Sequence, residues 1–297
     1  MTWVWVAAAA LLVAAGLVGN NRLVVTRYRV ELPGLRPPAG HVSAGRGTPA
    51  ARARHAGPAS RLRIVHLSDL HGKRFGRGER DRLVRTVRGC LPDLIAVSGD
   101  VLDHRRDVTT RAIEELRALA AIAPVVVCRG NHDLCPRQWD DLVAALRGEA
   151  VHLLQNDLLV LQVAGVPLVV AGVEERAVYR EDEEAWLAAL GDLADRASAC
   201  SHPRILLAHR PDYISRYAKT GFALSLSGHA HGGQVRIPGV GALWAPDQGF
   251  LPRHAEGIHQ GDGFTAVVSR GLGPSTFPFR IANPPQVILL ECEPSGS

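Results

Sequence analysis

Apolar and polar positions along the chain form short blocks that predict strands and helices in alternation. Five short, mainly apolar runs predict buried strands, at residues 62–67, 94–98, 125–128, 205–208 and 223–227. Helical periodicity predicts helices at residues 81–90, 111–123, 139–147 and 181–200. Strands that alternate with helices indicate an α/β layered fold.

The C-terminal third is rich in predicted strands, at residues 235–237, 264–269 and 286–291. We therefore expect two sheets packed together, with helices on the outside. Hydrophobic residues make up 46% of the 297 residues and charged residues 21%, which suits one large domain or two small ones and argues against global disorder. The five cysteines include no C-x-x-C pair, so we expect no disulfide framework.

The N-terminal segment, residues 3–18, is continuously apolar and lies at the short end of what spans a bilayer. Basic residues follow it, beginning at Arg22, whereas a cleaved signal peptide carries them in front. The pattern favours an uncleaved single-pass anchor in the cell membrane over a cleaved signal. The positive-inside rule then places the remainder of the chain in the cytoplasm.

The anchor is followed by an alternating pattern at residues 24–32, which predicts a half-buried strand, and by a Pro-, Gly-, Ala- and Arg-rich loop at residues 33–60. Nine arginines and a single acid, Glu31, lie between Arg22 and Arg63. This basic block favours an anionic membrane surface as a partner, and no motif indicates nucleic acid. The expected organisation is an anchor at 1–20, a strand with a basic juxtamembrane loop at 21–60, and a catalytic domain at 61–293.

Clusters of metal-ligand residues follow the apolar runs, each at a predicted strand end. In order they are Asp69 with His71, Asp100 with Asp103, Asn131 with His132 and Asp133, His209, and His229 with His231. Any one cluster is explained as well by a turn or a structural histidine. Five in series indicate a two-metal hydrolase, which needs carboxylates, imidazoles and a polar amide converging from separate strands.

The second and third clusters suggest distinct roles for their members. Asp100 has two carboxylate oxygens and can bridge two cations, while Asn131 offers a neutral oxygen ligand. His132 is adjacent and points elsewhere, so we expect it to act as the acid that protonates a leaving alkoxide. Asp133 is then expected to hold the His132 ring in one tautomer. For Asp103 we expect either a hydrogen-bonding role within its loop or a metal-linked role.

Two further histidines, His104 and His254, are candidates for substrate binding, because a substrate phosphate needs additional cations nearby. The remaining histidines are interpreted as structural. The ligand set of Asp, His and Asn suits Mn, Fe or Zn, and leaves the identity of the metal open.

The ordered series D-x-H, G-D-x-x-D, G-N-H-D, H and G-H-x-H resembles that of the calcineurin-like metallophosphoesterases, over residues 62–290. The extended forms at residues 68–72 and 228–234 resemble the membrane-anchored bacterial phosphodiesterases, similar to the UDP-2,3-diacylglucosamine pyrophosphatase type. This resemblance implies a four-layer α/β/β/α sandwich. Two departures are Ala230, where that branch has Thr, and Pro285-Gln286, where it often has Pro-Glu; the loop at residues 33–60 is also longer than usual for the branch.

The resemblance also implies how the ligands divide between two metal ions. Asp69, His71 and His231 would hold one ion; Asn131, His209 and His229 would hold the other. Asp100 would bridge them, and His132 would be the general acid or a donor to the phosphate. The expected reaction is hydrolysis of a phosphodiester or pyrophosphate bond by metal-bound hydroxide, on a phosphate-ester or lipid-linked diphosphate substrate. The alternatives are a protein phosphatase and a non-catalytic metal-binding scaffold.

Overall fold

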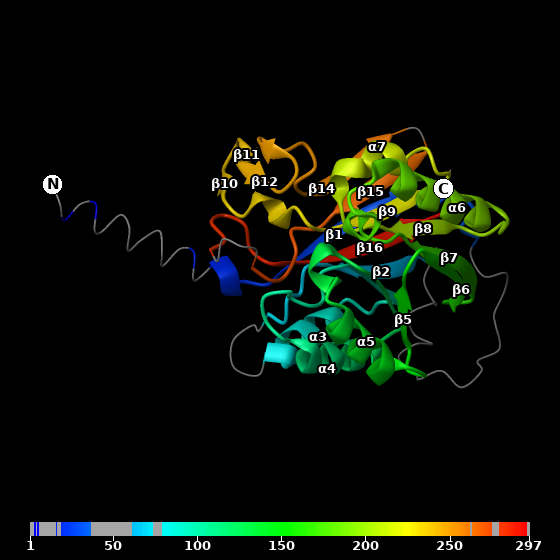
Figure 1. Cartoon of the computed structure of the whole chain (residues 1–297), viewed down its shortest axis with the longest axis horizontal. Coiled ribbons are helices and arrows are strands. Elements are labelled where there is room, and N and C mark those ends of the chain that lie inside the picture. Colours follow the sequence, from blue (N-terminus) through cyan, green and yellow to red (C-terminus); the bar gives the residue numbers. More distant parts are fainter. Residues whose placement is uncertain are drawn as a thin grey trace.

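The computed structural model is a sandwich of two six-stranded sheets with helices on both outer faces (Figure 1). It describes Trp3, Trp5, Gly16 and residues 19–36, 61–73, 79–261, 263–274 and 279–295. The four layers follow the expected order of helix, sheet, sheet and helix, which confirms the α/β class.

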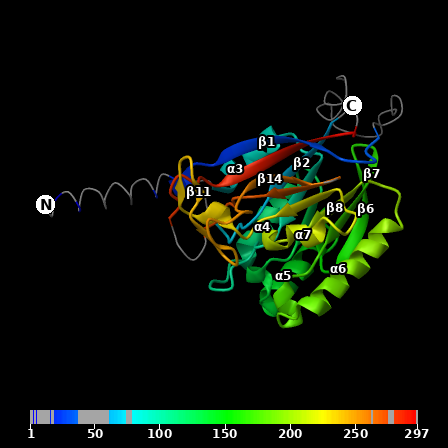
Figure 2. The ribbon, with the colours of Figure 1, turned by 90° about the horizontal axis from the view of Figure 1, so that it is seen from above.

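The first sheet has the order β1-β16-β2-β3-β4-β5. Its strands are β1 (Val24–Glu31), β16 (Gln286–Glu293), β2 (Leu62–Leu67), β3 (Leu94–Ser98), β4 (Val125–Cys128) and β5 (Val151–Leu154). All neighbouring pairs are parallel except β16 with β2. β1 and β16 lie side by side (Figure 2), so the strand predicted at residues 24–32 joins the sheet next to the last strand of the chain.

The second sheet has the order β14-β15-β9-β8-β7-β6 and is parallel between β15 and β7. Its strands are β14 (Gly257–Gly261), β15 (Phe264–Val268), β9 (Leu224–Ser227), β8 (Arg204–Leu207), β7 (Val166–Gly172) and β6 (Asp157–Val163). β3 and β4, in the first sheet, are buried on both faces, which explains why their sequences are mainly apolar rather than alternating.

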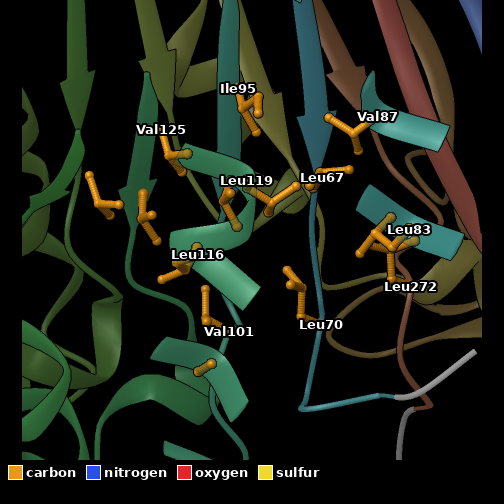
Figure 3. Close-up of a cluster of buried hydrophobic side chains, with 14 of the residues drawn as sticks. Leu67, Leu70, Leu83, Val87, Ile95, Val101, Leu116, Leu119, Val125 and Leu272 are labelled. Atoms are coloured by element: carbon orange, nitrogen blue, oxygen red, sulfur yellow. The ribbon is translucent and has the colours of Figure 1, made fainter. Parts of the chain in front are cut away.

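Helices α3 (Glu79–Gly89), α4 (Thr109–Ala120) and α5 (Pro136–Leu146) cover the outer face of the first sheet. Leu116 and Leu119 of α4 pack near Ile95 and Val125 of the sheet (Figure 3). Helices α6 (Glu183–Ser198) and α7 (Ile214–Tyr217) cover the second sheet through Trp186 and its neighbours. Truncating a fully buried leucine such as Leu116 to alanine would cost about 2–5 kcal/mol.

The four predicted helices and the nine predicted strands, including the alternating one at residues 24–32, are confirmed within a few residues. The hairpin of β6 and β7 and the neighbouring β5 were not predicted. β6 is an edge strand whose residues are mostly only partly buried, and its turn to β7 uses Ala164 and Gly165, both at positive φ. Alanine is not a usual residue for a hairpin turn of that kind, so the sequence carried no turn signal.

The structure contradicts the predicted location of the protein in the membrane through an anchor at residues 1–20. Within the described residues, no helix has the length and apolar character needed to cross a bilayer. Of the proposed anchor at residues 1–20, the structure describes Trp3, Trp5, Gly16, Gly19 and Asn20, and the rest of the apolar run lies outside the described residues. Most of the basic loop at residues 33–60 also lies outside them.

A small lobe of two hairpins follows β9 and lies at one end of the sandwich (Figure 1). Its strands are β10 (Arg236–Ile237) with β11 (Gly241–Ala242), and β12 (Trp244–Ala245) with β13 (Gly249–Phe250). We refer to residues 236–250 as the β10–β13 lobe. Only the strand at its start was predicted from sequence, because two-residue strands leave no periodic pattern.

Candidate metal centre

The carboxyl ends of β2, β3, β4, β8 and β9 meet at one edge of the sandwich, and the predicted clusters lie on the turns that follow these strands. Four side chains form a first group whose potential ligand atoms all lie within 4.8 Å of one another: Asp69, His71, Asp100 and His231. All four residues are at most 5% exposed. His231 Nε2 lies 3.3 Å from Asp69 Oδ1, and His71 Nε2 lies 3.6 Å from Asp100 Oδ2.

Three more side chains form a second group, which contacts Asp100 through His209. His209 Nε2 lies 3.3 Å from Asp100 Oδ2. His229 Nδ1 lies 2.8 Å from Asn131 Oδ1 and 3.3 Å from His209 Nε2. The structure therefore brings all seven candidate ligands together in two groups, and Asp100 is the residue that contacts both.

Five of these seven residues have a left-handed backbone. The φ angles of Asp69, His71, Asp100, His229 and His231 lie between 48° and 63°. A non-glycine residue in this region costs roughly 1–2 kcal/mol, so such positions are uncommon. Their concentration at one edge indicates strained turns that the surrounding sheets hold in place, as is typical of functional sites.

Glycines allow the turns to approach this closely. A Cβ atom at Gly228 would overlap the side chains of Ser68 and Asp69, and one at Gly130 would overlap Asp100. Both glycines have ordinary backbone angles, so they are needed for space rather than for φ. The side chain of Asp100 occupies the space that a side chain at position 130 would need.

Two histidine rings are oriented by the main chain. His71 Nδ1 lies 3.1 Å from Leu102 O, and His209 Nδ1 lies 2.7 Å from Ser98 O. Because a carbonyl only accepts, Nδ1 of each ring donates, and each Nε2 lone pair is free to bind a cation when the ring is neutral. His71 Nε2 is buried and has no hydrogen-bond partner in the structure.

The charges in the site are balanced by close imidazole–carboxylate pairs. Burial alone would lower the pKa of His209, but the Asp100 carboxylate outweighs it and raises the pKa to about 10. Burial lowers the pKa of His231 to about 3. The donor set of two carboxylates, four imidazoles and an amide oxygen fits divalent Mn, Fe or Zn, and the unpartnered His71 nitrogen is the kind of atom that a bound ion would satisfy.

Asp133 does not contact the His132 ring as predicted, but holds the backbone of neighbouring turns instead. Asp133 is fully buried, and its oxygens accept hydrogen bonds from the backbone N–H groups of Asp100, Leu102 and Gly130 at 2.7–2.8 Å. It therefore fixes the turn that carries Asp100. The reason is local: residues 131–133 form a single 3-10 turn, which directs Asp133 back toward the main chain.

The carboxylate nearest the His132 ring is instead that of Asp103, whose Oδ1 lies 3.7 Å from His132 Nδ1. The ring of His132 also packs against His71, with centroids 4.6 Å apart. Burial lowers the pKa of His132 to about 4, so the ring is neutral near pH 7. A neutral ring can still donate its N–H to a bound phosphate.

Of the two histidines predicted to contact substrate, only His104 lies beside a candidate catalytic residue, His132. Its ring centroid is 4.1 Å from that of His132. The ring of His254 packs on His259 at 4.8 Å, and the backbone of His254 bonds to Gln248. These contacts give His254 no link to the candidate metal centre in the described part of the chain.

Sequence reasoning missed three charged residues that contact or support the site. Asp247 Oδ2 lies 2.7 Å from His229 Nε2 and 3.1 Å from Arg210 Nη1. Arg280 is 1% exposed, and its Nη2 lies 3.3 Å from His231 Nδ1. Asp247 and Arg280 belong to no motif, so only Arg210, directly after His209, carried a positional hint.

Comparison with known proteins agrees with the geometry. The family model described as calcineurin-like phosphoesterase matches residues 62–233, more than half of the chain. The chain is 28% identical over 234 residues to the uncharacterized metallophosphoesterase YkuE of Bacillus subtilis, covering 76% of this chain and 77% of that protein. It is 29% identical over 242 residues to the phosphodiesterase YaeI of Escherichia coli, covering 78% and 83%.

A solved structure, that of the Haemophilus influenzae NAD nucleotidase NadN, has a similar fold. The TM-score is 0.50 at 15% sequence identity, and the match covers 72% of this chain and 46% of that one. At this identity the likeness concerns the sandwich alone.

Proposed function

Because this chain belongs to the calcineurin-like phosphoesterase family, we propose that it is a dinuclear metal-dependent enzyme that cleaves a phosphodiester or pyrophosphate bond. Family membership makes it a hydrolase of phosphate esters that uses divalent metal ions. The observation that carries the finer proposal is the convergence of buried Asp and His donors on both sides of Asp100. The domain boundaries at residues 61 and 293 stay a prediction.

The proposed ligand division follows the two groups. One ion would be held by Asp69, His71 and His231, and the other by Asn131, His209 and His229; Asp100 contacts side chains of both groups. When bound, two divalent ions would offset the charge of the phosphate oxygens and lower the pKa of water. The metal identity among Mn, Fe and Zn is open.

The chain's own residues perform the remaining tasks. The carbonyls of Ser98 and Leu102 hold the rings of His209 and His71 with Nε2 toward Asp100. His132 packs its ring against His71 of the first group and donates an N–H to the phosphate or the leaving oxygen. Asp133 keeps the Asp100 turn rigid through its three backbone contacts.

A lipid-linked substrate is the finer form of this proposal. The β10–β13 lobe and the residue after it carry large exposed apolar side chains, among them Trp244, Phe250 and Leu251, and Phe250 is 84% exposed. The turn of the β12–β13 hairpin also carries Asp247, which contacts the candidate ligand His229. An apolar surface this near the site supports a substrate whose phosphate is attached to an apolar group.

The direct test is turnover of bis(p-nitrophenyl) phosphate by purified protein with added Mn²⁺ and measured metal content. Wild-type protein should hydrolyse it, and His132→Ala should lower the rate by about 100-fold or more. The proposal fails if metal-loaded protein shows no turnover and His132→Ala behaves identically.

Matched substrates separate the alternatives. A short-chain and a long-chain lipid diphosphate should differ in kcat/KM if the lobe binds the apolar group, and Phe250→Ser should reduce that difference. Faster turnover of a phosphopeptide than of either would indicate a protein phosphatase. Protein that binds metal but turns over none of these substrates would indicate a non-catalytic metal-binding scaffold.

A further inference from the structure

His229 is held differently from the other histidines in its group. Its metal-facing atom is Nδ1, which lies 2.8 Å from Asn131 Oδ1 and 3.3 Å from His209 Nε2. Its other nitrogen, Nε2, lies 2.7 Å from Asp247 Oδ2. His209 has the reverse arrangement, with Nδ1 on a backbone carbonyl and Nε2 toward Asp100.

The carboxylate of Asp247 determines which nitrogen of His229 carries the proton. A carboxylate is only an acceptor, so Nε2 must donate, and the lone pair of a neutral ring then lies on Nδ1. Nδ1 is the nitrogen that faces Asn131 and His209. A carboxylate behind a ligating imidazole also raises the basicity of the ligand.

Asp247 is itself held in place from the opposite side. The same oxygen, Oδ2, lies 3.1 Å from Arg210 Nη1. Arg210 Nε lies 2.6 Å from Oε1 of Glu175, which is 3% exposed. An ion pair with a buried carboxylate therefore positions the guanidinium, and the guanidinium positions Asp247. Asp247 also has a left-handed backbone, with φ of 59°, in the turn between β12 and β13.

We propose that Asp247 is the positioning residue of His229 and thereby sets the affinity of the second metal position, which makes the β10–β13 lobe part of the metal centre. This inference rests on the proposed function for the existence of two metal positions. A direct role for Asp247 in holding phosphate is excluded by its charge, since a carboxylate repels a phosphate oxygen.

The test is titration of metal-free, full-length protein with Mn²⁺ by calorimetry, and with Co²⁺ by visible absorbance. Wild-type protein should show two binding events. Asp247→Ala should weaken one of them by about 10–100-fold and leave the other within about threefold. The Co²⁺ absorbance of the weakened position should change in Asp247→Ala, because the His229 ring is no longer fixed.

Asp247→Asn provides the conservative rescue. Because a single oxygen of Asp247 accepts from both His229 and Arg210, the amide oxygen of asparagine can take both contacts. Its second-site affinity should recover most of the loss seen in Asp247→Ala. A residue that acts only through the fold of the lobe would not show this ranking of metal affinities, with Asp247→Asn above Asp247→Ala.

Glu256→Gln is the matched control. Glu256 follows the lobe and pairs with Arg236 and Arg270, and these contacts involve no candidate ligand. It should bind metal like the wild type. Equal thermal stability of the metal-free variants would show that each is folded.

The inference is overturned if Asp247→Ala binds both ions like the wild type, or if Glu256→Gln loses as much affinity. These outcomes are separate from the activity. Protein that binds two ions and hydrolyses no phosphate ester would refute the proposed function and leave the role of Asp247 standing.

Discussion

The two pairs of histidines in the candidate metal centre are held by different parts of the molecule. His71 and His209 donate to backbone carbonyls at the end of β3 and in the loop after it. His229 and His231 contact the side chains of Asp247 and Arg280, which lie on irregular segments outside the central strands. The first pair therefore depends on the main chain and the second pair on two individual side chains.

This difference determines which histidine rings keep their orientation when neighbouring residues are substituted and which do not. A carbonyl acceptor survives substitution of its own side chain, so the rings of His71 and His209 follow from the fold. The rings of His229 and His231 can be perturbed by single substitutions that leave both sheets intact. Variation in metal affinity should therefore arise mainly from the second pair.

The largest effect is expected where both groups meet. Asp100→Asn keeps an oxygen but removes the charge that faces His71 and His209. We expect turnover to fall by about 1,000-fold, equivalent to about 4 kcal/mol at 1.36 kcal/mol for each factor of ten, and both metal positions to weaken. The measurement is kcat/KM with added Mn²⁺ together with metal content.

Asp107→Asn is the control for that variant. Asp107 pairs with Arg137 on the surface, and this exposed pair contributes little to stability. Its activity should equal that of the wild type. Activity of Asp100→Asn within tenfold of the wild type would contradict the shared role of Asp100.

A smaller effect is expected for the support of His231. Arg280 Nη1 donates to Arg270 O at 2.8 Å and Nη2 donates to Gly273 O at 2.5 Å, and Gly273 N in turn donates to Asp69 O. Arg280→Met would leave two carbonyls without their donor, while it removes the cost of a buried charge. We expect the free energy of unfolding to fall by about 2 kcal/mol.

Urea unfolding of the metal-free protein, followed by circular dichroism, measures this change. Arg117→Met on the surface of α4 is the control and should change stability by less than about 0.5 kcal/mol. Arg280→Met also removes the guanidinium that lies 3.3 Å from His231 Nδ1, so metal affinity should change at the Asp69 position and stay unchanged at the His209 position. Equal changes at both positions would show that the two pairs of histidines are not independent.

The same division explains what the sequence could predict. The seven candidate ligands were found because each follows a buried strand, and strand ends at one edge of a sheet must lie together. The helices were found because their apolar faces pack on the first and second sheets with a regular period.

What the sequence could not predict depends on tertiary contacts. Asp133 is next to His132 in the chain, yet the 3-10 turn sends it to the backbone of Asp100, and Asp103 lies nearer the His132 ring instead. Asp247 lies 18 residues from His229 and Arg280 lies 49 from His231, with no repeating pattern between them. Gln286, where the resembling branch often has Glu, accepts from Arg270 N and donates to Thr26, and the contact with Thr26 arises only when β1 joins β16.

The smallest effect concerns the protons that metal binding displaces. The pKa of His209 is raised to about 10 by Asp100 despite burial, so this ring carries a proton near pH 7 in the metal-free protein. The pKa of His231 is lowered to about 3, first by burial, so that ring is already neutral. Because a cation binds the neutral ring, metal binding at pH 7 should release about one proton from His209 and none from His231.

Calorimetry in two buffers of different ionisation enthalpy measures the protons released. His209→Gln should release about one proton fewer than the wild type, and the difference should shrink as the pH rises toward 10. The same shift has a consequence for stability. The folded pKa of His209 is above its unfolded value, so its contribution to the metal-free fold is complete below pH 6.5 and is lost as the pH rises through 10. Equal proton release by wild type and His209→Gln at pH 7 would show that the His209–Asp100 pair is not charged before the metal arrives.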